Sequence, residues 1–186
     1  MSKIMEDCLK NVRVESDLIG SLEVPADALY GVQTLRGIEN FPISCFHLND
    51  YPLFINGLAM TKLAAAEANY QLGLLSDAQY NGITQACREI LEGKHHEHFP
   101  VDMIQGGAGT TTNMNANEVI ANRALQIMGY PLGKYKHCSP NDHVNCSQST
   151  NDAYPTAIHL GLYATHLEFM KHFIPLIDSF AAKAKE

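Results

Sequence analysis

The last part of the chain, residues 151–185, constrains the fold more than any other segment. Its pattern predicts one long helix, with Pro155 in the first turn and a kink at Pro175. A helix that is apolar on most sides has to be buried among several others. Only about three other long helices are predicted, so we expect this helix to pack in an oligomer or against further chain. Its apolar residues are Ile158, Leu160, Leu162, Tyr163, Leu167, Phe169, Met170, Phe173, Ile174, Leu176, Ile177 and Phe180.

The preceding residues predict a mainly α fold that begins with a small β-hairpin. Residues 1–11 have the composition of a loose leader, and residues 12–15 and 20–24 are expected to pair as short strands. Residues 26–49 are expected to be irregular. Helices are predicted over 53–71, over 76–93 after the capping box Ser76-x-x-Gln79, and over 113–128. The Gly-rich and polar segments 94–109 and 133–148 are expected to be loops.

The charge balance and composition exclude several classes of protein. The 186 residues carry a formal net charge of −7, and the basic residues are scattered, which argues against nucleic acid as a partner. No apolar stretch reaches the length of about 20 residues that a membrane span requires. Residues 1–14 contain no apolar signal-peptide core. The five cysteines form no C-x-x-C pair. We therefore expect a cytoplasmic protein with reduced thiols.

Two polar strings are candidates for binding a small anion. The first, residues 105–118, places glycines before a predicted helix, where the backbone can approach a ligand and free amides attract a carboxylate. In the second, Ser149, Thr150 and Asn151 directly precede the long helix and could cap it, bind a carboxylate, or do both. On spacing alone, helix capping is favoured over ligand binding for each string, because polar residues commonly cap helices.

Metal and nucleophile chemistry receive little support from the pattern. The run His95-His96-Glu97-His98 could bind a metal, and so could the set His137, Cys138, His143 and Cys146, but neither has the spacing of a structural zinc site. Both lie in predicted loops, so we expect solvated side chains and no metal ligands. The sequence contains no G-x-S-x-G, P-loop or dinucleotide fingerprint, and no cysteine protease signature.

Taken together, the strings QGGAGTTTNMNANEVIANR and SPNDHVNCSQSTNDAYPT resemble two signature regions of the aspartase/fumarase superfamily. A third string, from Glu15 to Phe41, is similar to the N-terminal region of that superfamily. Within the superfamily, the residues at positions 30, 108 and 150 are those of the aspartase branch and differ from the usual residues of class II fumarases. They are Tyr30, Ala108 and Thr150. Ser139 departs from the His-Pro-Asn-Asp run that forms a second dicarboxylate site in fumarases.

The resemblance implies reversible elimination of ammonia from L-aspartate to give fumarate. Thr110 would bind a substrate carboxylate, and Ser149, Thr150 and Asn151 would form another part of the same pocket. The superfamily takes its catalytic serine base from a Gly-Ser-Ser loop, and that string is absent here, so no catalytic base is expected in these residues and the chain alone is expected to be inactive. No organic cofactor is implied. Some members are activated by a divalent metal, for which the sequence shows no site.

The resemblance also implies a domain division and a partner. Residues 1–148 would form the N-terminal lyase domain, and residues 149–186 the first helix of a central helical bundle that assembles into a homotetramer. Two other functions stay open. One is class II fumarase, which acts on malate. The other is a non-catalytic, lyase-like interaction module.

Overall fold

The computed structural model describes residues 11–186, and the leader expected before them lies outside the described residues apart from Asn11. A hairpin comes first, formed by β1 (Val12–Ser16) and β2 (Ser21–Pro25), which pair antiparallel. The Asp17 carboxylate accepts hydrogen bonds from the backbone of Ile19 and Gly20 and so closes the turn. The predicted hairpin is confirmed.

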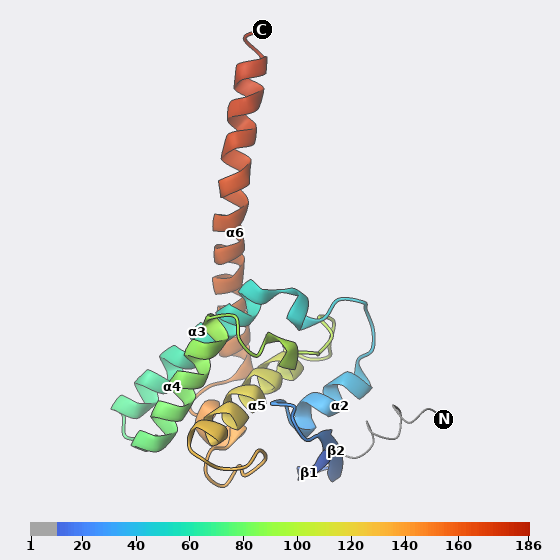
Figure 1. Cartoon of the computed structure of the whole chain (residues 1–186), viewed down its shortest axis with the longest axis vertical. Coiled ribbons are helices and arrows are strands. Elements are labelled where there is room, and N and C mark those ends of the chain that lie inside the picture. The colour runs from blue at the N-terminus through green and yellow to red at the C-terminus, as the bar shows by residue number, and fades with distance from the viewer. Residues whose placement is uncertain (1–10) are drawn as a thin grey trace.

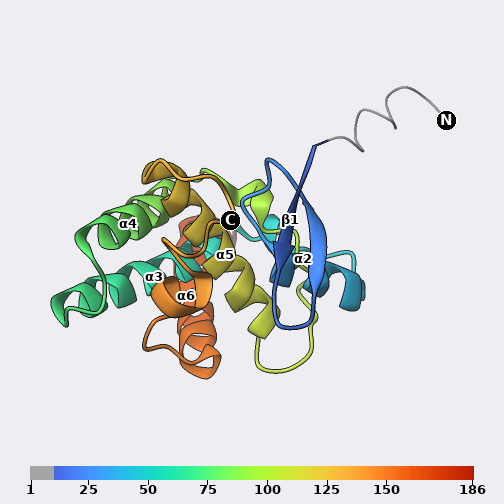
Figure 2. The ribbon, with the colours of Figure 1, turned by 90° about the horizontal axis from the view of Figure 1, so that it is seen from below.

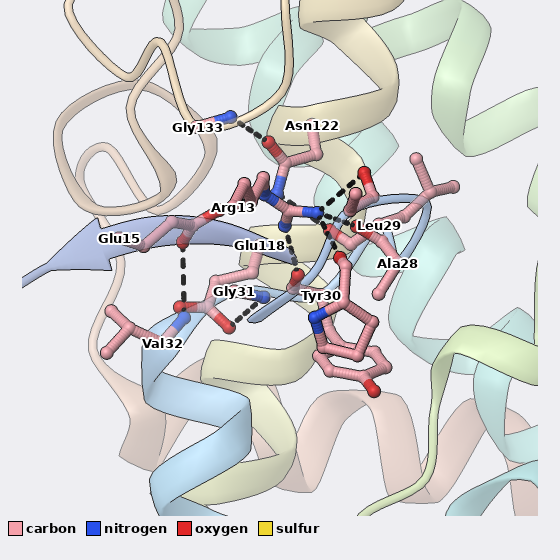
Figure 3. A network of polar contacts seen from close by, with 12 residues as sticks. Arg13, Glu15, Ala28, Leu29, Tyr30, Gly31, Val32, Glu118, Asn122 and Gly133 are labelled. Carbon is pink, nitrogen blue, oxygen red and sulfur yellow. Dashed lines mark hydrogen bonds and ion pairs between the residues drawn. The ribbon is translucent and has the colours of Figure 1, made fainter. Parts of the chain in front are cut away.

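A helix, α2 (Val32–Asn40), lies within the segment that we expected to be irregular, and that expectation is wrong. Its N-cap, Gly31, supplies no side-chain acceptor. The Glu118 carboxylate takes that role from a distant part of the chain, accepting from the backbone amides of Gly31, Gln33 and Thr34 at 2.8–3.0 Å. Figure 3 shows Glu118 beside Gly31, with Glu15 bonded to the amide of Val32. Because a carboxylate at a helix N-terminus satisfies its free amides, Glu118 fixes where α2 begins.

Three helices build most of the core: α3 (Pro52–Gln71), α4 (Asp77–Leu91) and α5 (Thr110–Ile127). The predicted capping box is present at α4, where Ser76 and Gln79 bond reciprocally. α3 packs against α4, and α4 against α5 (Figure 2). The core includes Leu48, Ile55, Leu58, Ile83, Ile90, Phe99, Val101, Val119, Ile120 and Leu125, all buried.

The segments expected to be loops contain three single-turn elements. They are η1 (Leu48–Asp50), η2 (His96–His98) and η3 (Pro140–Val144). The second and third lie within the predicted loops 94–109 and 133–148, and the first begins within 26–49 and ends at Asp50. None is long enough to leave a periodic apolar pattern, which is why the sequence did not predict them.

The long C-terminal helix, α6 (Thr150–Lys183), projects from the body (Figure 1). Only its beginning is buried, through Ala153, Ala157 and Gly161, and the backbones of α3 and α6 approach closely there. Pro155 is the sixth residue of α6, so it lies beyond the first turn in which it was expected. The helix runs past Pro175 as one element, and the kink there stays a prediction.

The exposed part of α6 carries large apolar side chains, including Leu162, Phe169, Ile174, Ile177 and Phe180, each at least 49% accessible. Within the described residues, no helix is both long and apolar enough to cross a membrane. The proposed domain boundary before residue 149 coincides with the N-cap of α6, Ser149.

Candidate substrate-binding site

The Gly-rich string forms a tight loop in front of α5. Gly107 and Gly109 have φ angles of +73° and +88°, a region that favours glycine. A Cβ atom at Gly109 would overlap the ring of Tyr154, so glycine is also required by space. Gln105 secures the loop, because its side chain donates to the Thr112 hydroxyl at 2.6 Å and accepts from the Thr112 amide at 2.9 Å.

A pocket of about 520 Å³ lies between this loop and the start of α6. Asn151 lines it from α6, together with Tyr154, and Gly107 to Gly109 line it from the loop. The fold thus joins the two strings that the sequence identified separately. The remaining lining residues are Met103, Ile104, Gln105, Pro155 and Ile158.

The other three predicted site residues take different places. Ser149 is the N-cap of α6, and its hydroxyl accepts from the Asn151 amide at 3.2 Å. The Thr150 hydroxyl accepts from the Asn113 side chain at 3.2 Å. Thr110 begins α5 and lines a separate hollow of about 150 Å³. Of the four predicted residues, only Asn151 lines the larger pocket.

A buried lysine contacts the second string and was not predicted from the sequence. Lys62, on α3, is 1% exposed, and its ammonium donates to three side-chain amide oxygens. The acceptors are Asn113 at 2.7 Å, Asn145 at 2.9 Å and Gln148 at 2.9 Å. Burial lowers the pKa of Lys62 to about 7. A signal was available, since Lys62 lies four residues from both Leu58 and Ala66, on the side of α3 that is buried.

The same amides hold the second string in place. Asn145 also accepts from Asn113 at 3.1 Å and from Asn117 at 3.2 Å, and Gln148 donates to the carbonyl of Val144 at 2.9 Å. Asn113 and Asn117 lie one turn apart on α5 and both donate to Asn145, so they belong to one polar cluster between α3, α5 and the loop before α6. The cluster fixes the segment from which Thr150 and Asn151 enter the helix.

The chemistry available in the pocket is that of neutral hydrogen-bond donors. The Asn151 side chain and the backbone amides of the Gly-rich loop can donate to a carboxylate. The first backbone amides of α5 have no acceptor within the helix. Burial raises the pKa of the Tyr154 phenol above its usual value. The lining residues include no carboxylate and no imidazole, the side chains that most often serve as a general base.

The two metal candidates from the sequence fare differently. Ligand atoms of His95, Glu97 and His98 all lie within 4.8 Å of one another, and no other such group occurs in residues 11–186. In the second set, Cys138 is buried and the His143 ring accepts from the Ser139 amide at 2.7 Å. The fold therefore gathers part of the first set and not the second.

Comparison with known proteins identifies close relatives. The chain is 56% identical to the aspartate ammonia-lyase of Pseudomonas aeruginosa over 174 residues, and 50% identical to that of Escherichia coli K12 over 177. These alignments cover 94% and 95% of this chain. The chain spans about 37% of the length of each of these relatives.

Solved structures give the same picture. A protein described as fumarate lyase:delta crystallin from Brucella melitensis, bound to cobalt, matches with a TM-score of 0.92 and 50% identity, over 94% of this chain and 38% of that one. Class II fumarase from Schistosoma mansoni matches with a TM-score of 0.76 and 39% identity, over 81% of this chain and 32% of that one. A family model described as Lyase matches residues 20–186. The chain therefore belongs to this lyase family, the aspartase/fumarase superfamily that its signature strings resemble.

Proposed function

We propose that this protein is an aspartate ammonia-lyase, which eliminates ammonia from L-aspartate to give fumarate in a reversible reaction. The observation that carries the proposal is the pocket in which Asn151 faces the loop of Gly107 to Gly109. Relatives of that name at 50–56% identity support it. The proposed ligand is a small dicarboxylate, and the proposed compartment is the cytoplasm.

The chemistry requires donors directed at one substrate carboxylate. Removal of a Cβ proton leaves a carbanion, which delocalises into that carboxylate as a dianionic enediolate. Fixed donors are worth most where charge develops in the transition state. Asn151 and the loop amides are suited to this role because Gln105 secures the loop and the Lys62 cluster secures the start of α6. Thr110 lines a different hollow in this chain, but it directly follows Gly109 of the loop, and we propose that it binds the same substrate from that side. Thr150 is proposed to bind the substrate beside Asn151, with Ser149 setting the helix start.

The proton acceptor is proposed to come from outside these residues, on the Gly-Ser-Ser loop that the superfamily uses. The absence of an ordinary base from the pocket lining and of that string from the sequence supports this. The apolar, exposed length of α6 supports burial in a helical bundle, and we propose that the assembly is a homotetramer. No organic cofactor enters the proposal.

The test is fumarate formation, followed by ultraviolet absorbance, with L-aspartate and L-malate side by side. The assay uses this chain alone and the product of the complete gene. We expect aspartate to be the substrate of the gene product and no activity from the chain alone. Preference for malate would favour a class II fumarase. No fumarate from either substrate with the gene product would favour a non-catalytic interaction module. Fumarate from the chain alone would refute the proposed origin of the base.

A further inference from the structure

The turn η2 gathers side chains that the proposed reaction does not use. His95 precedes it with a left-handed φ of +67°, and His98 ends it. In a 3₁₀ turn, side chains three residues apart eclipse one another. The rings of His95 and His98 accordingly lie with their centroids 6.3 Å apart and their planes 26° from parallel. The Glu97 carboxylate lies 3.5 Å from Nε2 of His98.

The remaining histidine of the run anchors the turn. Nε2 of His96 lies 2.9 Å from the carbonyl oxygen of Ile90, and its ring meets Phe99 edge-on at 6.5 Å. His98 also fixes the turn through its backbone, because its carbonyl accepts from the Asn115 side chain at 3.0 Å. The turn is therefore attached to α4 and α5, while His95, Glu97 and His98 are left partly accessible.

A second contact orients the His95 ring. Its Nε2 lies 3.0 Å from the Glu89 carboxylate, which the Arg123 guanidinium holds at 2.5 and 3.0 Å. Metal-binding histidines commonly donate their second ring N–H to a carboxylate, which fixes the tautomer and raises the basicity of the other nitrogen. The His95 tautomer with its proton on Nε2 donates to Glu89 and leaves the Nδ1 lone pair available to a metal ion.

The ligand types determine the class of ion. Two imidazoles and one carboxylate suit borderline ions such as Zn²⁺ and Co²⁺, whereas Mg²⁺ and Ca²⁺ prefer all-oxygen sites. We propose that His95, Glu97 and His98 form a surface site for a divalent transition-metal ion, with water completing its coordination. The ion draws the three ligand atoms together from within 4.8 Å. When Nε2 of His98 binds the ion, the ring proton lies on Nδ1. Nδ1 then no longer accepts the 3.4 Å hydrogen bond from the Leu29 amide.

This proposal concerns a site apart from the pocket and does not depend on the proposed function. The test is isothermal titration of the chain, without a histidine tag, with Zn²⁺ in a non-coordinating buffer. We expect one ion per chain at micromolar affinity. Co²⁺ provides a second readout, through the visible absorption of the bound ion.

Three variants locate the ion. The His95→Ala/His98→Ala double variant should weaken binding at least tenfold. Glu97→Gln should weaken it as well, and because Glu97 is exposed that change leaves the fold intact. Glu89→Gln should weaken it by about 10- to 100-fold, as loss of an orienting carboxylate does.

The matched control is His159→Ala, because His159 is exposed on α6 and far along the chain from the turn. It should bind as the unchanged chain does. Circular dichroism establishes whether each variant folds. If the double variant does not fold, the affinity of Glu97→Gln for Zn²⁺ is the test of the site. The proposal is overturned if the unchanged chain binds no Zn²⁺ at millimolar concentration, or if Glu97→Gln and the double variant bind it undiminished.

Discussion

The buried Lys62 should make the stability of the fold depend on pH between about 7 and the ordinary lysine pKa of 10.5. Burial lowers its pKa from 10.5 to about 7. The unfolded chain keeps the proton up to its ordinary pKa, whereas the folded chain releases it above about pH 7. Between these values the unfolded state binds more protons, so the free energy of unfolding rises with pH. Below about pH 7 the full cost of burying the charge is present.

The magnitude follows from the shift. Each pH unit in this window changes the free energy of unfolding by about 1.4 kcal/mol, so raising the pH from about 7 to about 8.5 adds roughly 2 kcal/mol. Replacing Lys62 by Met removes this dependence. It also removes the donor of the buried Asn113 oxygen and of the partly buried Gln148 oxygen, at about 1–3 kcal/mol for each one that finds no other partner. The Asn145 oxygen keeps its bonds from Asn113 and Asn117. The deficit of Lys62→Met relative to the unchanged chain should therefore grow with pH.

The assay is urea unfolding at about pH 6 and about pH 8.5, followed by circular dichroism at one protein concentration. Lys94→Met is the matched control, because Lys94 is exposed and pairs only with Glu92 at 2.7 Å. It should change the free energy of unfolding equally at both pH values. Parallel pH dependence of Lys62→Met and the unchanged chain would refute the reasoning.

Four further predictions concern the fold and the pocket. Gly57→Ala should lower the free energy of unfolding by about 1–3 kcal/mol, because its Cβ would meet the carbonyl of Ala157 on α6. Helix propensity alone predicts that the substitution raises the free energy of unfolding by about 1 kcal/mol. The sign of the change measured by urea unfolding therefore distinguishes the steric effect from helix propensity. Glu118→Ala should cost about 3–5 kcal/mol in the same assay, since three backbone amides lose their acceptor. The exposed Glu23→Ala is its control, and equal effects would contradict the capping role. In the complete gene product, Asn151→Ala and Thr110→Ala should each lower kcat/KM by about 10²–10³, as loss of an oxyanion donor does. Normal kinetics in both would remove the site assignment, and the exposed Asn81→Ala should have no effect. The chain alone should self-associate through residues 158–180, and a clean monomer in light scattering would contradict this.

Much of the helical fold could be predicted because its signals are local. The Ser76 and Gln79 capping box is complete within four residues, and α3, α4 and α5 each carry their own pattern of apolar residues. The hairpin is equally local, since Asp17 closes its turn. The two polar strings were also visible in the sequence, because runs of Thr, Ser and Asn are common at helix starts and unfavourable in helix interiors.

Other features depend on residues that meet only in the folded chain. α2 has no cap of its own, and the carboxylate that fixes its start is on Glu118, more than eighty residues away. Without that acceptor, residues 32–40 carry no start signal that a sequence pattern could show. Lys62 is similar, because a lysine on a buried helix face becomes intelligible only when Asn145 and Gln148 supply its acceptors.

The sequence by itself determined the family resemblance, the hairpin, the four longer helices and the two polar strings at helix starts. Only the tertiary structure decided that Asn151 shares a pocket with the Gly-rich loop while Thr110 does not. It also decided that His95 and His98 stack in a turn against Glu89. The physical reason is that local hydrogen bonds and apolar periodicity are written within one segment, whereas a pocket, a buried charge and a ligand cluster are made by segments that packing brings together.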